Sequence, residues 1–189
     1  CQRALQADIE TDYVRRLIVR RNLMPDPPPY SLPAWPWRWR IQALGRFAFS
    51  AGSPGAPGAA AGSKAAGRPM DLLQALIALG AERVKLERLG DALWPHVDSD
   101  YALRSLNTTL HRLRKLLGDD TAVLLQTGEL SLSRRHFWLD TWAFEQSADA
   151  ALALCATGLG TQPAELLLRH THQALAHYQG PLLADLTDA

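Results

Sequence analysis

Apolar residues recur every three or four positions between residues 101 and 118, which is the spacing of an amphipathic helix. Its apolar side consists of leucines: Leu103, Leu106, Leu110, Leu113 and Leu117. Its other side is polar or cationic: Arg104, Thr108, His111, Arg112 and Lys115. Residues 101–117 include no Asp or Glu, whereas a solvated helix usually mixes both charge signs to form pairs along its surface. The pattern predicts a helix that packs by its leucines and binds an anionic partner with its other side.

Two further helices are expected directly before this one. The first is marked by Leu72, Leu73, Leu76, Ile77 and Leu79 and ends at Gly80; the second is marked by Leu86, Leu89, Leu93 and Trp94 and ends at Pro95. Glycine favours the left-handed conformation that ends many helices, and proline cannot donate the next helical hydrogen bond.

Strand patterns lie on both sides of the three helices. Trp37, Trp39, Ile41 and Ala43 alternate with Arg38, Arg40 and Gln42, and Gly45 allows a bend before Phe49. Alternation with a period of two is typical of strands. Residues 123–126 and 130–132 are β-prone runs around Thr127, Gly128 and Glu129, which predicts a hairpin, and residues 136–139 form a further strand candidate. Strands, three helices and a hairpin follow each other in the order of a winged-helix domain.

The N-terminal part is expected to be a separate module. Residues 1–22 are interpreted as one helix, so that residues 1–23 form the helical end of a preceding module, and its arginines (Arg15, Arg16, Arg20 and Arg21) are interpreted as a solvated face in preference to a second binding site. The proline-rich residues 24–36 predict a semi-rigid linker. Because the first residue is Cys1 rather than methionine, we expect the chain to be a piece of a longer polypeptide.

Residues 140–189 are expected to form a helical hairpin. The first helix has an apolar face made of Phe144, Ala148, Ala151, Leu152 and Cys155. Gly158 and Gly160 interrupt it, and Thr161 with Pro163 begins a second helix that ends at Gly180 and Pro181. Because two amphipathic helices cannot bury both of their faces alone, the hairpin predicts the beginning of a helical repeat array.

Composition excludes several classes of protein. The net charge of the 189 residues is only +1, so affinity for nucleic acid must come from local clusters such as residues 104–115. No apolar run approaches the roughly 20 residues of a membrane span, and two distant cysteines fit neither a disulfide framework nor a redox motif. We expect a cytoplasmic protein.

The pattern of reactive side chains argues against catalysis. The six histidines are scattered, and no Ser/His/Asp, Cys/His or paired-carboxylate arrangement has usable spacing. The glycines of residues 52–62 are not followed by the Gly-Lys-Ser/Thr of a phosphate loop. The prediction is therefore that the chain is not an enzyme and needs no metal or cofactor.

The exposed side of the helix at residues 101–117 has the chemistry to read DNA. Arginine pairs with guanine through two hydrogen bonds, so Arg112, midway along the exposed side, is the first candidate for a base contact, with His111 and Thr108 beside it. Asn107 could contact adenine or bond locally. The residues nearer the edges are expected at phosphates: Arg104, Thr109, Arg114 and Lys115.

Other contacts are expected outside this helix. Arg134 and Arg135, which follow the hairpin, could reach the backbone or the minor groove. Trp94 could pack between helices or donate its indole N–H to a phosphate. From the basic helix alone, binding to an acidic protein surface is about as well supported as binding to DNA.

Longer segments resemble a known family. LGRF (44–47), MDLLQALIALGAERV (70–84, taken as a helix), LERLGDALWP (86–95) and LNTTLHRLRKLLGDD (106–120) resemble the OmpR/PhoB-type winged-helix domain of SARP-type bacterial transcriptional regulators. LSLSRRHFWLDTWAFE (130–145) and ALAHYQGPLLAD (174–185) resemble the beginning of the bacterial transcriptional activator domain that follows it. DYVRRLI (12–18) with the Pro/Trp-rich linker resembles the junction of large MalT-like regulators.

The resemblance implies a fold and a function. The fold is α+β: a winged helix over residues 37–139, with an N-terminal β-sheet, three helices and a C-terminal β-hairpin wing, and then an all-α, TPR-like segment over residues 140–189. Within the winged helix, residues 50–67 are almost entirely Ala, Gly, Ser and Pro, and this composition predicts a flexible loop. The third helix would enter the major groove, with Arg112 at bases, Arg104, Thr109, His111 and Arg114 in the groove or at phosphates, and Trp94 and Thr127 at the backbone. Here the wing, QTGELSLSRR (126–135), lacks the glycine-tyrosine tip common in such wings.

The function predicted from the sequence is specific binding of double-stranded DNA by a bacterial transcriptional regulator. The resemblance adds RNA polymerase and further protomers on tandem DNA repeats as partners. The alternative is a helical protein-interaction or oligomerisation module that does not read DNA. The predicted DNA-binding residues are Trp94, Arg104, Thr108, Thr109, His111, Arg112, Arg114, Lys115, Thr127, Arg134 and Arg135.

Overall fold

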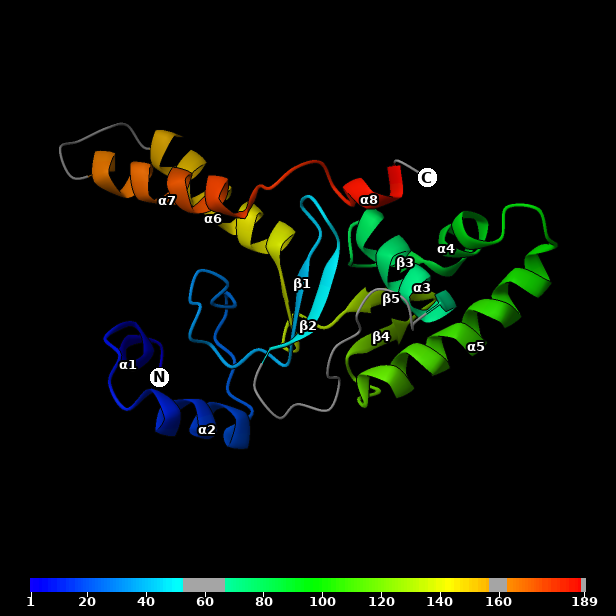
Figure 1. Cartoon of the computed structure of the whole chain (residues 1–189), viewed down its shortest axis with the longest axis horizontal. Helices are drawn as coiled ribbons and strands as arrows, with labels where there is room; N and C mark the ends of the chain where they lie inside the picture. Colours follow the sequence, from blue (N-terminus) through cyan, green and yellow to red (C-terminus); the bar gives the residue numbers. More distant parts are fainter. Residues whose placement is uncertain (53–66, 157–162, 188–189) are drawn as a thin grey trace.

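The computed structural model describes residues 1–52, 67–156 and 163–187, and its mixture of helices and small sheets confirms the α+β class (Figure 1). The helices are α1 (Gln2–Gln6), α2 (Thr11–Arg21), α3 (Gly67–Ala78), α4 (Leu86–Leu93), α5 (Ser99–Leu117), α6 (Asp140–Ala156), α7 (Pro163–His177) and α8 (Ala184–Thr187). The strands are β1 (Trp39–Gln42), β2 (Ala48–Ala51), β3 (Val84–Lys85), β4 (Val123–Gln126), β5 (Glu129–Leu132) and β6 (Phe137–Leu139). Most of the loop expected at residues 50–67, together with Gly158, Gly160 and Thr161, lies outside the described residues.

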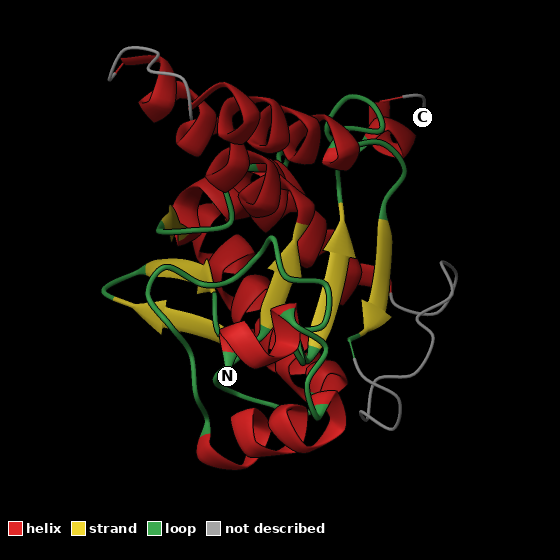
Figure 2. Cartoon of the chain, turned by 90° about the vertical axis from the view of Figure 1, so that its left-hand side faces the viewer, coloured by secondary structure: helices red, strands yellow, loops and turns green. Residues whose placement is uncertain are grey.

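The first sheet has the strand order β2-β1-β6 and joins distant parts of the chain (Figure 2). β1 is antiparallel to β2, with Trp39 opposite Ala51, and parallel to β6, with Trp39 opposite Phe137. The predicted alternation is confirmed, because Trp37, Trp39 and Ile41 are fully buried. The strand predicted at residues 136–139 therefore belongs to this N-terminal sheet.

The second sheet has the order β3-β5-β4 and contains the predicted hairpin of β4 and β5. Thr127 and Gly128 at its tip have φ values of 48° and 79°, and two consecutive positive φ values are typical of the type I′ turn that suits a two-residue hairpin. β3 was not predicted. The helix expected over residues 70–84 ends at Ala78, because Gly80 and then Ala81 take positive φ and turn the chain into β3.

α3, α4 and α5 pack together around a leucine core. The fully buried side chains that they contribute are Leu72, Leu73, Leu76, Leu89, Leu106, Leu113 and Leu117. Asp98 caps α5 by accepting a hydrogen bond from the amide of Asp100 at 3.2 Å, and Gly118 ends it with φ 65°. The leucine periodicity therefore predicted both the helix and its buried side.

The N-terminal segment differs from the prediction in two ways. The expected single helix is α1 and α2, separated where Asp8 and Glu10 take positive φ. Residues of the expected linker are also buried in the same core as the rest of the chain, since Tyr30 and Trp35 are each 2% exposed. Burying these aromatic rings removes a large apolar area from water, so the segment is packed against the sheet rather than held out as a spacer.

α6 and α7 lie side by side as the predicted helical hairpin (Figure 1). The buried face of α6 is not the expected one: it consists of Trp142, Ala143 and Ser147, whereas Leu152 is 66% exposed. The reason is that α6 continues directly from β6, so its first turns pack against the N-terminal sheet. There Asp140 accepts hydrogen bonds from the amides of Ala43 and Leu44 at 2.8–2.9 Å.

Candidate nucleic-acid interface

α5 runs along one edge of the molecule (Figure 1), and the polar side chains on one of its sides are exposed. The exposed polar residues on this side are Arg104, Asn107, Thr108, His111, Arg112 and Lys115. Within the parts of the chain that the structure describes, the charged groups of Arg104, Arg112 and Lys115 form neither an ion pair nor a hydrogen bond. These three residues, with His111, are named below the cationic face of α5.

The unpaired state of these cations points to an external anion. The leucines on the opposite side already hold α5 to the core, so its folding does not require the cationic face. The nearest acidic residues in sequence, Asp100 and Asp119, lie at the two ends of the helix. A row of free cations on a rigid helix is suited to a polyanion whose charges are themselves regularly spaced.

Two residues predicted at phosphates lie elsewhere. Thr109 is 5% exposed and donates its hydroxyl hydrogen to the carbonyl of Ser105 at 2.8 Å, so its placement on the exposed side was wrong. Arg114 is half-buried, and its Nε and Nη2 both donate to the carbonyl of Val123 at 3.1 and 2.7 Å. Arg114 therefore fastens α5 to β4 and is not free to hold a phosphate through these two atoms.

The expected contact of Arg134 with DNA also conflicts with the structure. Its Nε and Nη2 form an ion pair with Glu82, the second contact at 3.0 Å, and its guanidinium lies 4.8 Å from the centre of the Trp142 ring. β5 ends at Leu132, so Arg134 is at the base of the hairpin and reaches across to α6. Arg135 is exposed, and no described side chain pairs with it.

The two remaining predicted contacts differ in exposure. Thr127 is exposed at the tip of the hairpin, where a backbone contact is sterically open. Trp94 is half-buried against the core, and the guanidinium of Arg68 lies 5.7 Å from the centre of its ring. This packing of the Trp94 ring agrees with the first of its two interpretations, in which the side chain packs between helices.

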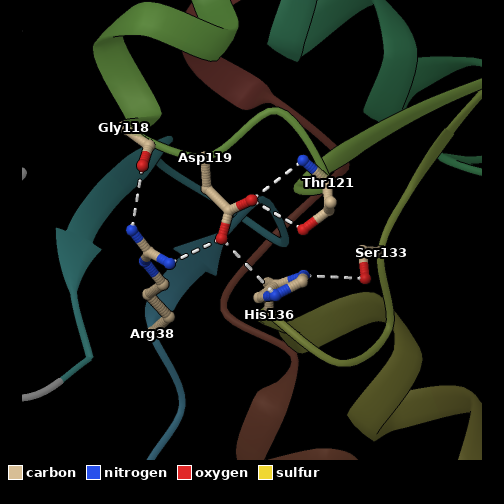
Figure 3. A network of polar contacts seen from close by, with 6 residues as sticks. All are labelled: Arg38, Gly118, Asp119, Thr121, Ser133 and His136. Carbon is tan, nitrogen blue, oxygen red and sulfur yellow. Dashed lines mark hydrogen bonds and ion pairs between the residues drawn. The ribbon is translucent and has the colours of Figure 1, made fainter.

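A polar cluster that was not predicted from the sequence lies at the C-terminal end of α5 (Figure 3). Asp119 accepts a hydrogen bond from Arg38 at 2.5 Å and two from Thr121, and it lies 3.7 Å from His136. Burial tends to raise the pKa of the Asp119 carboxyl, but the hydrogen bonds from Thr121 and the charges of His136 and Arg38 bring the pKa below its usual value. No sequence signal connects Arg38 with an aspartate 81 residues away.

The described residues meet the requirements of neither a metal site nor a membrane-spanning helix. Among the described residues, no three His, Cys, Asp or Glu side chains lie close enough to share a metal ion. Within the same residues, none of the helices combines the length and apolar character needed to span a bilayer.

Comparisons with known proteins give a structural likeness but no family. No family model matches the sequence, and no curated protein matches it. Among solved structures, the chain is similar to Mycobacterium tuberculosis EmbR in complex with a low-affinity phosphopeptide, with a TM-score of 0.55 and 23% sequence identity. The fold is EmbR-like. The likeness covers 80% of this chain but only 38% of the EmbR chain, so it concerns the fold of one part of that protein.

Proposed function

We propose that the chain binds double-stranded DNA by placing the cationic face of α5 in the major groove, as the DNA-binding part of a bacterial transcriptional regulator. The observation that carries the proposal is the row of exposed, unpaired cations on a helix that its leucines fix to the core. The major groove of B-DNA is about 12 Å wide and admits one α-helix. The proposal agrees with the EmbR-like fold and with the resemblance of residues 44–47 and 70–120 to the winged-helix domain of SARP-type regulators.

The residues of α5 divide into two roles by their position on the exposed side. Arg112, which lies between Arg104 and Lys115 along the helix, is assigned to a guanine edge, with His111 and Thr108 beside it. Arg104 and Lys115 lie nearer the two ends of α5 and are assigned to phosphates, which position the helix without reading sequence. Arg135 and Thr127 are assigned to the DNA backbone, with the β4–β5 hairpin acting as the wing.

The C-terminal helices are assigned to contacts between proteins. In this proposal the chain is an OmpR/PhoB-type winged helix followed by the beginning of a TPR-like activator domain, and it works in the cytoplasm. Its protomers would bind tandem DNA repeats and contact RNA polymerase. Residues 1–23 contribute Leu5, Val14 and Ile18 to the same core as residues 37–139, so in this proposal they belong to the DNA-binding part rather than to a separate module.

Direct titration of duplex DNA at several salt concentrations tests the proposal. With Arg104, Lys115 and Arg135 as phosphate contacts, the plot of log binding constant against log salt should have a slope of about −3, because each contact contributes about −0.9. A duplex selected from a random pool should bind more tightly than an unselected one. Absence of duplex binding at low salt would contradict the proposal.

A protein-interaction module is the second candidate, and one observation favours it. The helical hairpin of α6 and α7 exposes large apolar side chains, among them Leu152 at 66%, Leu168 at 57% and Leu175 at 60%. Exposed apolar patches of this kind are typical of protein contacts. This candidate predicts that the chain associates with itself or binds a protein partner, and that changes at Arg112 leave this association unaffected. It also predicts that selection from a random duplex pool enriches no DNA sequence.

A further inference from the structure

The carboxylate of Asp119, just after α5, contacts Arg38 before β1, Thr121 before β4 and His136 before β6 (Figure 3). Arg38 donates from Nη1 to Asp119 at 2.5 Å and from Nη2 to the carbonyl of Gly118 at 3.1 Å. On its other side, Asp119 accepts from the amide and hydroxyl of Thr121 at 2.8 and 2.6 Å. The Arg38 guanidinium therefore sits where the last carbonyls of a helix carry partial negative charge.

The partners of Asp119 are held by the N-terminal sheet. The carbonyl of Arg38 accepts from the amide of Gly52 at 2.8 Å, and the carbonyl of His136 accepts from the amide of Trp39 at 3.0 Å. His136 is further fixed by the contact of its Nδ1 with the Ser133 hydroxyl at 2.9 Å. Arg38 and His136 thus come from neighbouring strand ends of one sheet and meet at one carboxylate.

This attachment differs in kind from the leucine packing of α5. Apolar contacts are not directional, so leucines alone leave some freedom for a helix to roll or tilt. Ion pairs and hydrogen bonds fix direction, because they weaken steeply with distance and angle. A 19-residue helix is about 28 Å long, and a tilt of about 10° at one end would displace the other end by about 5 Å, which is more than a base contact tolerates.

We infer that Arg38 and Asp119, with His136 beside them, are positioning residues that set the direction in which α5 presents its cationic face. The inference rests on the proposed function, since that direction matters for entry into the major groove. Arg38 acts through Asp119 and the end of α5 and makes no contact with DNA itself.

Substitution at each end of the ion pair tests the inference. Arg38→Gln and Asp119→Asn should each weaken duplex binding about tenfold, the size of the loss expected for one charged hydrogen bond. The double variant should be no weaker than either single variant, because both remove the same contact. Arg46→Gln is the matched control: Arg46 also pairs with an aspartate, Asp185, at 3.6 Å, but its side chain is 90% exposed and far in sequence from α5. Its duplex affinity should be unchanged.

The salt dependence separates positioning from direct contact. In Arg38→Gln the slope of log binding constant against log salt should equal that of the unaltered chain, because no phosphate contact is lost. A slope smaller by about 0.9 would mean that Arg38 itself holds a phosphate and would overturn the inference. Unchanged duplex affinity in folded Arg38→Gln and Asp119→Asn would overturn it as well.

Hydrogen exchange tests the same inference without DNA. In Asp119→Asn, the backbone amides of residues 115–119 should exchange about tenfold faster, which is the effect of losing a contact of this strength, while the amides of residues 106–110 stay protected by the leucine core. Equal exchange rates in both proteins would overturn the positioning role. If the unaltered chain fails to bind duplex DNA, the proposed function fails, and this exchange result alone decides whether the attachment exists.

Discussion

The cationic face of α5 and the connection between β5 and β6 look alike in sequence but differ in structure. Arg112 and Lys115 are exposed and have no partner among the described residues. Arg134 has a similar sequence context, yet it pairs with Glu82 and lies over the ring of Trp142. Whether an arginine can bind an external anion therefore depends on its neighbours in the folded chain. An arginine that is paired with a neighbour stabilises the protein, and an unpaired one is available to an external anion.

The largest expected effect tests the scaffold that carries the cationic face. Leu113 is fully buried, so Leu113→Ala should lower the free energy of unfolding by about 2–5 kcal/mol. Urea denaturation followed by circular dichroism measures it. Leu116→Ala is the matched control on the same helix, because Leu116 is 42% exposed and its removal should change stability little. Equal losses in the two variants would show that α5 is not packed by this stripe.

The next effect separates paired from free arginines. Arg134→Ala removes an ion pair whose side chains are 42% and 38% exposed, so screening limits the loss of unfolding free energy to about 1 kcal/mol. Arg135→Ala should leave stability unchanged and weaken duplex binding slightly. Thermal denaturation and duplex titration of both variants give the four values needed. A larger loss of duplex affinity in Arg134→Ala than in Arg135→Ala would contradict the distinction between the paired and the unpaired arginine.

The smallest effect concerns the pH dependence of stability. Burial lowers the pKa of His136, which the charges of Arg38 and Arg135 lower further while Asp119 opposes them. The unfolded chain therefore binds more protons than the folded one just below the ordinary histidine pKa of about 6.5. The contribution of His136 to the free energy of unfolding should be fully present above that pH and should decrease as the pH falls below it.

His136→Gln should flatten this decrease in stability. Burial also lowers the pKa of His177, so His177→Gln is the matched comparison. It should remove only the contribution of His177 to the pH dependence of stability. Urea denaturation at a series of pH values from neutral to mildly acidic measures both contributions. A pH profile that His136→Gln leaves unchanged would contradict the protonation difference assigned to His136.

Local patterns in the sequence predicted much of the fold. The leucine stripe of α5, the alternation around Trp39 and the turn at Thr127 and Gly128 each express a periodicity or a backbone preference that acts within a few residues. The same reasoning missed β3, because a two-residue strand has no periodicity of its own. It also misassigned the buried face of α6, which depends on the packing of Trp142 after β6 rather than on the helix alone.

The candidate site was predictable only in part. The exposed positions of Arg104, His111, Arg112 and Lys115 follow directly from the helical period. The hydrogen bonds from Arg114 to the carbonyl of Val123 could not be predicted from that period, because they depend on where β4 begins relative to the end of α5. The attachment of Asp119 to Arg38 spans 81 residues, so no pattern that acts within a few residues predicts it.

The most direct test compares base reading with phosphate binding on the same face. The affinity of a duplex selected from a random pool, divided by that of an unselected duplex, should fall in Arg112→Ala by the equivalent of about 1–3 kcal/mol. Lys115→Ala should weaken both duplexes alike and leave this ratio unchanged. An unchanged ratio in Arg112→Ala, with the protein folded, would contradict the assignment of the cationic face of α5 to sequence-specific reading of DNA.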